Sequence, residues 1–169
     1  DCGVLFEGFH SDSAWTVRAG NKKDKKAQEI DLFLKTGETA LDLAIKQVKP
    51  GNHIGDISKA IQDTIEGAGF SVVKTLIGHG VGKKLHEDPE VPGFVKDKRE
   101  KTPLLLPGLT IAIEVIYCLG GDEVIYKGND GWTIATKDAT ISGLFEATVA
   151  LGDHGSFLLT KKYGTSGNH

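Results

Sequence analysis

The chain has 169 residues, which predicts one domain with enough length for a hydrophobic core. Its hydrophobic fraction of 39% and charged fraction of 25% are ordinary for a globular protein, and no apolar stretch reaches membrane-spanning length. The net charge of -3 argues against a nucleic-acid partner held by bulk electrostatics, and two cysteines are too few for a disulfide framework, so we expect a reducing, cytoplasmic compartment.

The first part of the chain predicts a hairpin followed by two helices. The stretch "DCGVLFEGFHSDSAWTV" (residues 1–17) indicates two strands around a Glu7-Gly8 turn. Apolar residues then recur at helical spacing over residues 30–48, before Pro50-Gly51, and again over residues 54–65. A short strand is expected over residues 70–77.

The second part is rich in predicted strands, which cover residues 109–117, 122–127, 131–136, 141–151 and 155–160. Residues 78–108 contain several prolines and glycines and are expected to form a long loop. This order predicts a single α+β domain over residues 1–169, in which a curved antiparallel sheet has helices packed on one face.

Two predicted strands carry an acidic residue in an apolar context. Glu114 lies between Ile113 and Val115, and Glu146 follows Phe145. A charge that is buried alone costs several kcal/mol, so buried acids tend to be paired or to bind metal. The alternative is an edge strand whose acid points to solvent.

The predicted hairpin adds two more acids. A two-residue turn at Glu7-Gly8 places Gly3 opposite Asp12, with Asp1 and Asp12 projecting to the same side. Their β-carbons are then roughly 6–8 Å apart, and the carboxylates repel unless cations lie between them. Ordinary surface acids of a hairpin are the alternative interpretation.

Two histidines lie in "IGHGVGKKLHEDPEV", residues 77–91. We interpret the glycines around His79 as a tight turn that directs one imidazole, from His79 or His86, toward the acids. A site with four carboxylates and a single nitrogen suits a pair of divalent metal ions such as Mn, Fe(II) or Co, whereas structural zinc favours Cys and His ligands.

These segments, in this order, resemble type I methionine aminopeptidases, which are metallopeptidases of the pita-bread fold. The resemblance runs from Asp1 to about Leu159 and rests on five stretches of the sequence: "DCGVLFEGFHSD", "GHGVGKKLHEDPEV", "LPGLTIAIEVI", "DGWTIATKD" and "LFEATVAL". It implies a hydrolase that removes the N-terminal methionine from newly made proteins by means of a hydroxide that bridges two metal ions.

The resemblance also implies a role for each site residue. Asp1 would bind one metal ion, His79 and Glu114 would bind the other, and Asp12 and Glu146 would bridge the two. Glu114 would in addition shuttle a proton.

Three further residues would contact the substrate. His86 would hydrogen-bond the scissile peptide group, while Leu85 and Trp132 would line the pocket for the methionine side chain. The implied partners are N-terminal peptides of nascent proteins, with transient ribosome contact, no membrane and no direct nucleic-acid binding.

The sequence departs from the family pattern in three places. Leu85 stands where an aromatic residue is frequent, and Ala147 stands where a histidine is often found after the bridging glutamate. The family also has a segment before the first aspartate, so the fold is expected to be incomplete at the N-terminus. We therefore expect an upstream segment, and a monomer when that segment is present.

Two other functions belong to the same fold. Xaa-Pro aminopeptidases or dipeptidases share the ligand set but usually have another histidine between the histidine loop and the first glutamate strand, and residues 90–107 contain none. A non-catalytic homologue that binds ribosomes or nucleic acid would have lost metal ligands, whereas this chain retains all five. The short interval from His79 to Glu114 also disfavours the long insertion of type II enzymes.

Overall fold

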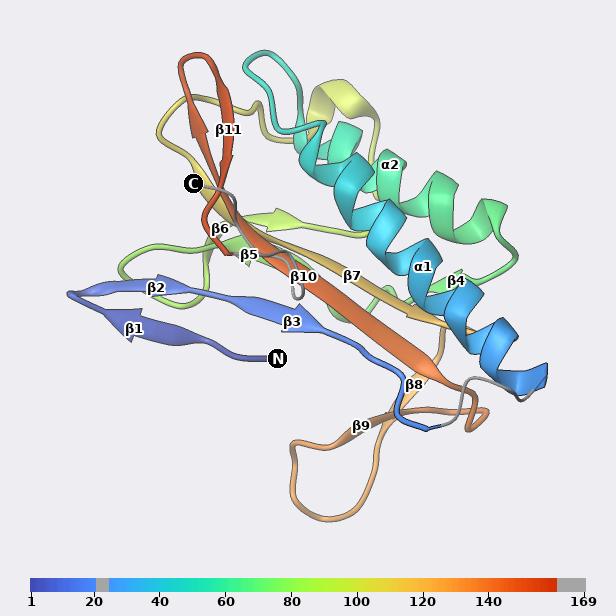
Figure 1. Ribbon diagram of the computed structural model, residues 1–169. Coiled ribbons are helices and arrows are strands. Elements are labelled where there is room, and N and C mark those ends of the chain that lie inside the picture. Colours follow the sequence, from blue (N-terminus) through green and yellow to red (C-terminus); the bar gives the residue numbers. More distant parts are fainter. Residues whose placement is uncertain (21–24, 161–169) are drawn as a thin grey trace.

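The computed structural model describes residues 1–20 and 25–160, which form a sheet covered on one face by two helices (Figure 1). The main sheet has the strand order β11-β10-β7-β5-β6; β3 also pairs with β10, and β4 with β7. Every strand pairing in the described residues is antiparallel, as the sequence predicts. The strands of this sheet are β3 (Ser13–Trp15), β4 (Ser71–Val72), β5 (Gly78–Gly80), β6 (Glu87–Val91), β7 (Thr110–Cys118), β10 (Ser142–Gly152) and β11 (Gly155–Leu158).

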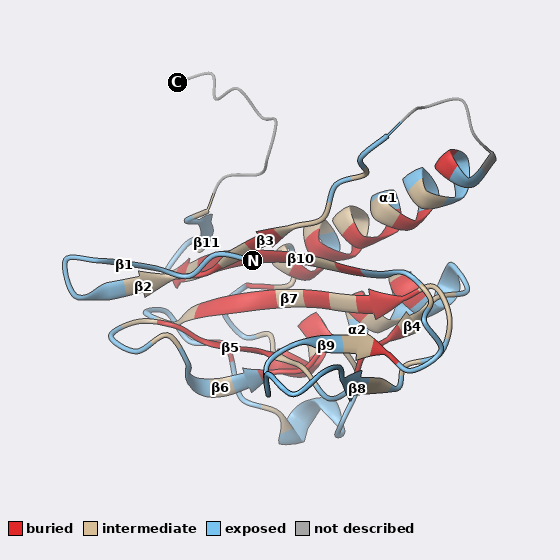
Figure 2. Cartoon of the chain, turned by 90° about the horizontal axis from the view of Figure 1, so that it is seen from below, coloured by how far each residue is buried: buried red, intermediate tan, exposed pale blue. Residues whose placement is uncertain are grey.

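Two short hairpins extend from this sheet. One is formed by β1 (Val4–Phe6) and β2 (Phe9–Ser11), and the other by β8 (Val124–Tyr126) and β9 (Ile134–Thr136). Phe6 pairs with Phe9 across the Glu7-Gly8 turn, which confirms the predicted register of the first hairpin. Figure 2 shows that both hairpins are largely exposed, whereas β5, β7 and β10 are largely buried.

The helices pack on the sheet through apolar stripes that the sequence predicts. Helix α2 (Ile54–Gly67) buries Ile54, Ile57, Ile61 and Ile65, which are spaced to lie on one face. Helix α1 (Lys25–Ile45) begins earlier than the apolar stripe indicates. A short 3-10 helix, η1 (Arg99–Lys101), packs against α2.

Helix α1 approaches the sheet closely at Gly37. A β-carbon at this position would lie 2.5 Å from both Tyr117 Oη and Phe145 Cδ2. The Tyr117 hydroxyl also donates a hydrogen bond of 2.6 Å to the carbonyl oxygen of Phe33 in α1. Tyr117 is a β7 residue and Phe145 a β10 residue, so this contact fixes α1 over the two strands that carry the glutamates.

Tyr117→Phe is expected to lower the free energy of unfolding by about 1 kcal/mol, because it removes a buried hydrogen bond and leaves the ring in place. Urea denaturation followed by circular dichroism measures this change. Tyr126→Phe, at an exposed tyrosine, is the matched control and should unfold like the parent. An equal loss in both variants would show that the bond to Phe33 does not stabilise the fold.

The region predicted as a long loop contains two strands, so that prediction is wrong. Gly78-His79-Gly80 is strand β5, which pairs with β6 on one side and β7 on the other. The predicted strand over residues 70–77 is correspondingly reduced to β4. Neither Gly78 nor Gly80 has a positive φ. The glycines are instead required by close strand approach: a β-carbon at Gly78 would collide with the carbonyl oxygen of Ala112, and one at Gly80 with that of Asp88.

Candidate metal centre

The five predicted ligands line one cleft of about 520 Å³: Asp1, Asp12, His79, Glu114 and Glu146. His86 and Trp132 line the same cleft. The structure therefore brings together seven of the eight residues that the sequence singles out. Leu85 is the exception, since it does not line this cleft.

The sheet register aligns the two glutamates. Glu146 of β10 lies directly opposite Glu114 of β7, so their side chains share one face of the sheet. On the other side of β7, His79 lies opposite Ala112, two residues from Glu114. Because alternate residues of a strand face the same side, His79 is directed to the face that carries both glutamates.

Asp12 lies between β2 and β3, close to His79 and Glu146. One possible ligand atom from each of these three residues lies within 4.8 Å of the other two, and all three residues are buried. The His79 Nε2 atom is 3.9 Å from Asp12 Oδ2 and 3.5 Å from Glu114 Oε1. Asp1, in contrast, is exposed at the edge of the cleft.

The ring of His79 is oriented by its own strand. Its Nδ1 atom lies 2.9 Å from the carbonyl oxygen of Gly80, which can only accept, so Nδ1 donates a hydrogen bond to that oxygen. The Nε2 atom faces Asp12 and Glu114, where it can ligate a metal ion. The His86 ring is exposed, with its centroid 4.3 Å from that of His79.

Glu114 and Glu146 lie in a buried environment that disfavours their charged forms. Burial, followed by the charge of Asp12, raises the pKa of Glu114 to about 7. Burial, followed by the charges of Glu114 and Asp12, raises the pKa of Glu146 to about 8. Among the described residues, Glu146 Oε1 is the buried side-chain oxygen that has no hydrogen-bond partner, and Glu146 is only 3% exposed.

This donor set fits divalent cations. A buried carboxylate oxygen without a partner is rare in folded proteins, and acids tend to crowd together in this way where a positive charge joins them. Carboxylate oxygens with one imidazole nitrogen are ligands that Mn, Fe(II) and Co accept. The structure shows which residues converge; the number of ions and their identity stay a prediction.

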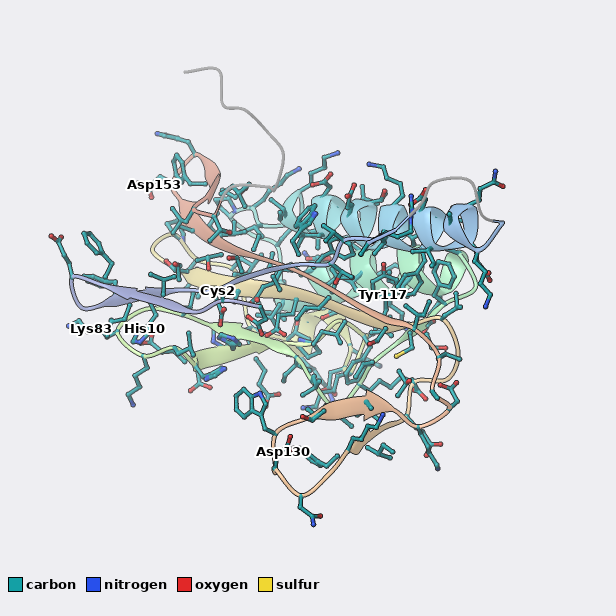
Figure 3. All side chains as sticks on the ribbon, turned by 60° about the horizontal axis from the view of Figure 1, so that its bottom comes forward. Cys2, His10, Lys83, Tyr117, Asp130 and Asp153 are labelled. Carbon is teal, nitrogen blue, oxygen red and sulfur yellow. The ribbon has the colours of Figure 1, made fainter. Side chains whose placement is uncertain are left out.

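Leu85 lies beside Gly3, the residue that precedes β1 of the first hairpin. A β-carbon at Gly3 would be 3.2 Å from Leu85 Cδ1 and 3.7 Å from Asp12 Oδ1, so Gly3 leaves room for both side chains. The hairpin is attached to this loop, because the His10 amide donates a hydrogen bond of 2.7 Å to the Gly82 carbonyl. Figure 3 shows His10 beside Lys83 of the same loop.

Trp132 lies on the loop between β8 and β9, and its side chain is 86% exposed. The Asp130 carboxylate, labelled in Figure 3, accepts hydrogen bonds from the amides of Trp132 and Thr133, both at 2.9 Å. The hydrogen bond from the Thr133 hydroxyl, followed by these two amide bonds, lowers the pKa of Asp130 to about 2, and together the three bonds fix the tip of the loop. Tyr126 of β8 also lines the cleft, and sequence reasoning missed it because nothing in "DEVIYK" distinguishes a cleft residue from a surface one.

Comparison with known proteins decides the family. Residues 1–152 match metallopeptidase family M24. The chain belongs to this family. Among its curated relatives is a methionine aminopeptidase of Aquifex aeolicus, 42% identical over 161 residues that make up 95% of this chain and 60% of the relative. Methionine aminopeptidase 1 of Bacillus subtilis is 38% identical over 163 residues, with coverage of 95% and 62%.

Solved structures of family members have the same fold. The crystal structure of methionine aminopeptidase from Thermotoga maritima superposes with a TM-score of 0.85 at 36% identity, covering 95% of this chain and 61% of that one. The prolidase of Pyrococcus furiosus, at 23% identity and a TM-score of 0.66, shares the fold alone. The predicted pita-bread fold is confirmed, and the chain spans about 60% of the length of the relatives cited first.

No helix in residues 1–20 and 25–160 is both long enough and apolar enough to span a membrane.

Proposed function

We propose that this chain carries the dinuclear metal centre of a methionine aminopeptidase and removes the N-terminal methionine from peptides of newly made proteins. The observation that carries the proposal is the buried facing pair Glu114 and Glu146, with an unpartnered oxygen on Glu146 and the imidazole of His79 beside it. Relatives named methionine aminopeptidase, 35–42% identical over most of the chain, support the choice of substrate.

The ligand roles are those that the resemblance to methionine aminopeptidases implies. Asp1 is assigned to one ion, His79 and Glu114 to the other, and Asp12 and Glu146 to both. Divalent ions bound there would supply a nucleophile at neutral pH by acidifying water, and would neutralise charge on the carbonyl oxygen of the scissile bond. We assign one metallopeptidase domain to residues 1–169 and propose Mn, Fe(II) or Co as the metal.

The remaining residues bind the peptide and move protons. The Glu114 carboxylate would accept a proton from the attacking water and return it to the leaving amine, a general base that becomes a general acid. His86, exposed on the cleft beside His79, would hydrogen-bond the scissile peptide group. The resemblance implies that Trp132 and Leu85 contact the methionine side chain. Trp132 and Tyr126 line the cleft and would form walls of this pocket, whereas Leu85 lies beside Gly3, outside the cleft lining.

The proposed partners are N-terminal peptides, with transient ribosome contact. A cytoplasmic location is proposed because Cys2 and Cys118 are both free thiols. Neither alternative function is preferred. The likeness to prolidases is confined to the fold, and the metal ligands that a non-catalytic homologue would lack all line the cleft.

A peptide assay tests the proposal. The chain is supplied with Mn²⁺ or Co²⁺ and a Met-Ala-Ser peptide, and free methionine is measured by chromatography. Methionine release that a chelator abolishes is the expected result. An Ala-Pro peptide tests the Xaa-Pro alternative, and Glu146→Gln controls for contaminating peptidases. Release from the Xaa-Pro peptide alone, or equal release by the Gln variant, would refute the proposal.

A further inference from the structure

One edge of β10 changes its partner at Thr148. Residues Phe145 to Ala147 pair with β3, whereas residues Val149 to Gly152 pair with β11. Thr148 lies between the two ladders and is fully buried. Its carbonyl oxygen accepts a hydrogen bond of 2.9 Å from the Leu159 amide. Its amide donates a bond of 3.0 Å to the Thr160 hydroxyl, so the backbone of Thr148 is bonded to the segment after β11.

The side chain of Thr148 is bonded to Asp12 instead. Its hydroxyl accepts a hydrogen bond of 2.8 Å from the Asp12 amide and donates one of 2.7 Å to the Asp12 carbonyl oxygen. Ser13 pairs with Ala147, so the next position along the same register brings Asp12 opposite Thr148. A single hydroxyl therefore replaces the two backbone bonds that the ladder would otherwise make at this position.

The contact between Thr148 and Asp12 fixes the position of one candidate metal ligand, Asp12, relative to another, Glu146. Thr148 is two residues from Glu146 on the same strand, so tying the Asp12 backbone to Thr148 sets the spacing between Asp12 and Glu146. The Asp12 carboxylate is oriented in turn, because Oδ1 accepts a hydrogen bond of 3.0 Å from the Ser13 amide. Its other oxygen, Oδ2, is the one that lies 3.9 Å from His79 Nε2.

The same bond pair occurs at the far end of the β3–β10 ladder. There the Thr16 hydroxyl accepts a hydrogen bond of 2.9 Å from the Leu144 amide and donates one of 2.7 Å to the Leu144 carbonyl. Thr16 makes the same two contacts as Thr148 but bonds to a residue that offers no metal ligand. The chain thus contains a matched control for the loss of one strand-joining hydroxyl.

We propose that Thr148 is a positioning residue. Its hydroxyl holds the Asp12 backbone so that the carboxylates of Asp12 and Glu146 can bind the same metal ion. The inference rests on the proposed metal centre. Groups that orient metal ligands through hydrogen bonds contribute to metal affinity without touching the ion. Loss of the Thr148 hydroxyl frees the backbone at Asp12, and the ligand set then binds metal less tightly.

Calorimetric titration with Mn²⁺ or Co²⁺ tests this role in four chains: the parent, Thr148→Val, Thr148→Ser and Thr16→Val. Thr148→Val keeps the shape of the side chain and is expected to lose about 10–100-fold in metal affinity. Thr148→Ser retains the hydroxyl and should bind nearly as tightly as the parent. Thr16→Val should bind like the parent even though its melting temperature falls as far as that of Thr148→Val. The visible absorption bands of bound Co²⁺ should change in Thr148→Val alone.

Equal affinity in Thr148→Val and the parent, or an equal loss in Thr16→Val, would overturn the positioning role while leaving the metal centre in place. A parent chain that binds no metal would instead refute the proposed function, and the inference with it. Hydrogen exchange in the metal-free parent gives a test that needs no variant. The Asp12 amide should be protected, and an Asp12 amide that exchanges as fast as an exposed one would refute its bond to Thr148.

Discussion

His79→Ala is expected to lose both metal and activity, whereas His86→Ala loses activity and keeps its metal. His79 is 8% exposed, and its Nε2 atom faces the carboxylates of Asp12 and Glu114. Its replacement removes the nitrogen ligand that we propose and leaves several carboxylates facing one another. Mutation of a residue that only hydrogen-bonds to a metal ligand lowers metal affinity by up to ~100-fold. We expect a larger loss here, because His79 is itself a proposed ligand.

His86 differs from His79 in what surrounds it. It is exposed on the cleft wall beside His79, so it is available to the substrate. Loss of one hydrogen-bond donor to a reacting group lowers turnover by about 10²–10³-fold, and we expect a loss of that size in His86→Ala. Metal content should stay near that of the parent.

Metal analysis after gel filtration and a peptide assay measure the two effects separately. His154→Ala is the matched control, because it removes an exposed imidazole from the turn between β10 and β11, outside the cleft. It should equal the parent in both measurements. Equal metal loss in His79→Ala and His86→Ala would mean that the two roles are assigned wrongly, and full activity in His86→Ala would remove it from the mechanism.

The sequence predicts the positions of the glutamates because local pattern and tertiary structure agree there. Glu114 and Glu146 each interrupt an apolar strand, and both strands are buried in the sheet as neighbours. The isoleucine stripe of α2 is predicted for the same reason, since its spacing alone defines a buried face. The hairpin register follows from the Glu7-Gly8 turn, which fixes the pairing of Phe6 with Phe9.

The sequence does not predict features that depend on contacts between distant segments. Gly78 and Gly80 suggest a turn, but they are strand residues whose hydrogens leave room for the backbones of β6 and β7. Thr148 is one threonine in an apolar strand, and its bond to Asp12 joins residues 136 positions apart. Tyr126 enters the cleft only through the placement of the β8–β9 hairpin. No local spacing encodes any of these contacts.

Gly78→Ala is expected to destabilise the fold and weaken the metal centre together. A β-carbon at Gly78 would collide with the Ala112 carbonyl oxygen, and it would lie 3.1 Å from the Glu114 amide nitrogen and 3.2 Å from the Val91 carbonyl oxygen. These are backbone atoms of two neighbouring strands, so no side chain can rotate away to make room. The strain should reach the upper part of the range for overpacked cores, about 3 kcal/mol.

Relief of this clash would move β5 away from β7 and so displace the proposed metal ligands on these strands. Gly78 precedes His79 on β5, and the nearest backbone atoms belong to β7 next to Glu114. Separation of β5 from β7 increases the distance from His79 Nε2 to Glu114 Oε1, which is 3.5 Å in the parent. Metal affinity should therefore fall in Gly78→Ala, although Gly78 itself has no side chain that could bind metal.

Thermal denaturation and metal titration measure the two effects. A loss of about 3 kcal/mol corresponds to roughly 6–12 °C in the melting temperature of a domain of this size. Gly67→Ala is the control for the added methyl group: it lies at the end of α2 with nothing within 4 Å of the new β-carbon, and it should stabilise the fold by about 0.5 kcal/mol. If Gly78→Ala melts with the parent and binds metal as tightly, the close packing of β5 against β7 does not hold His79 in the site.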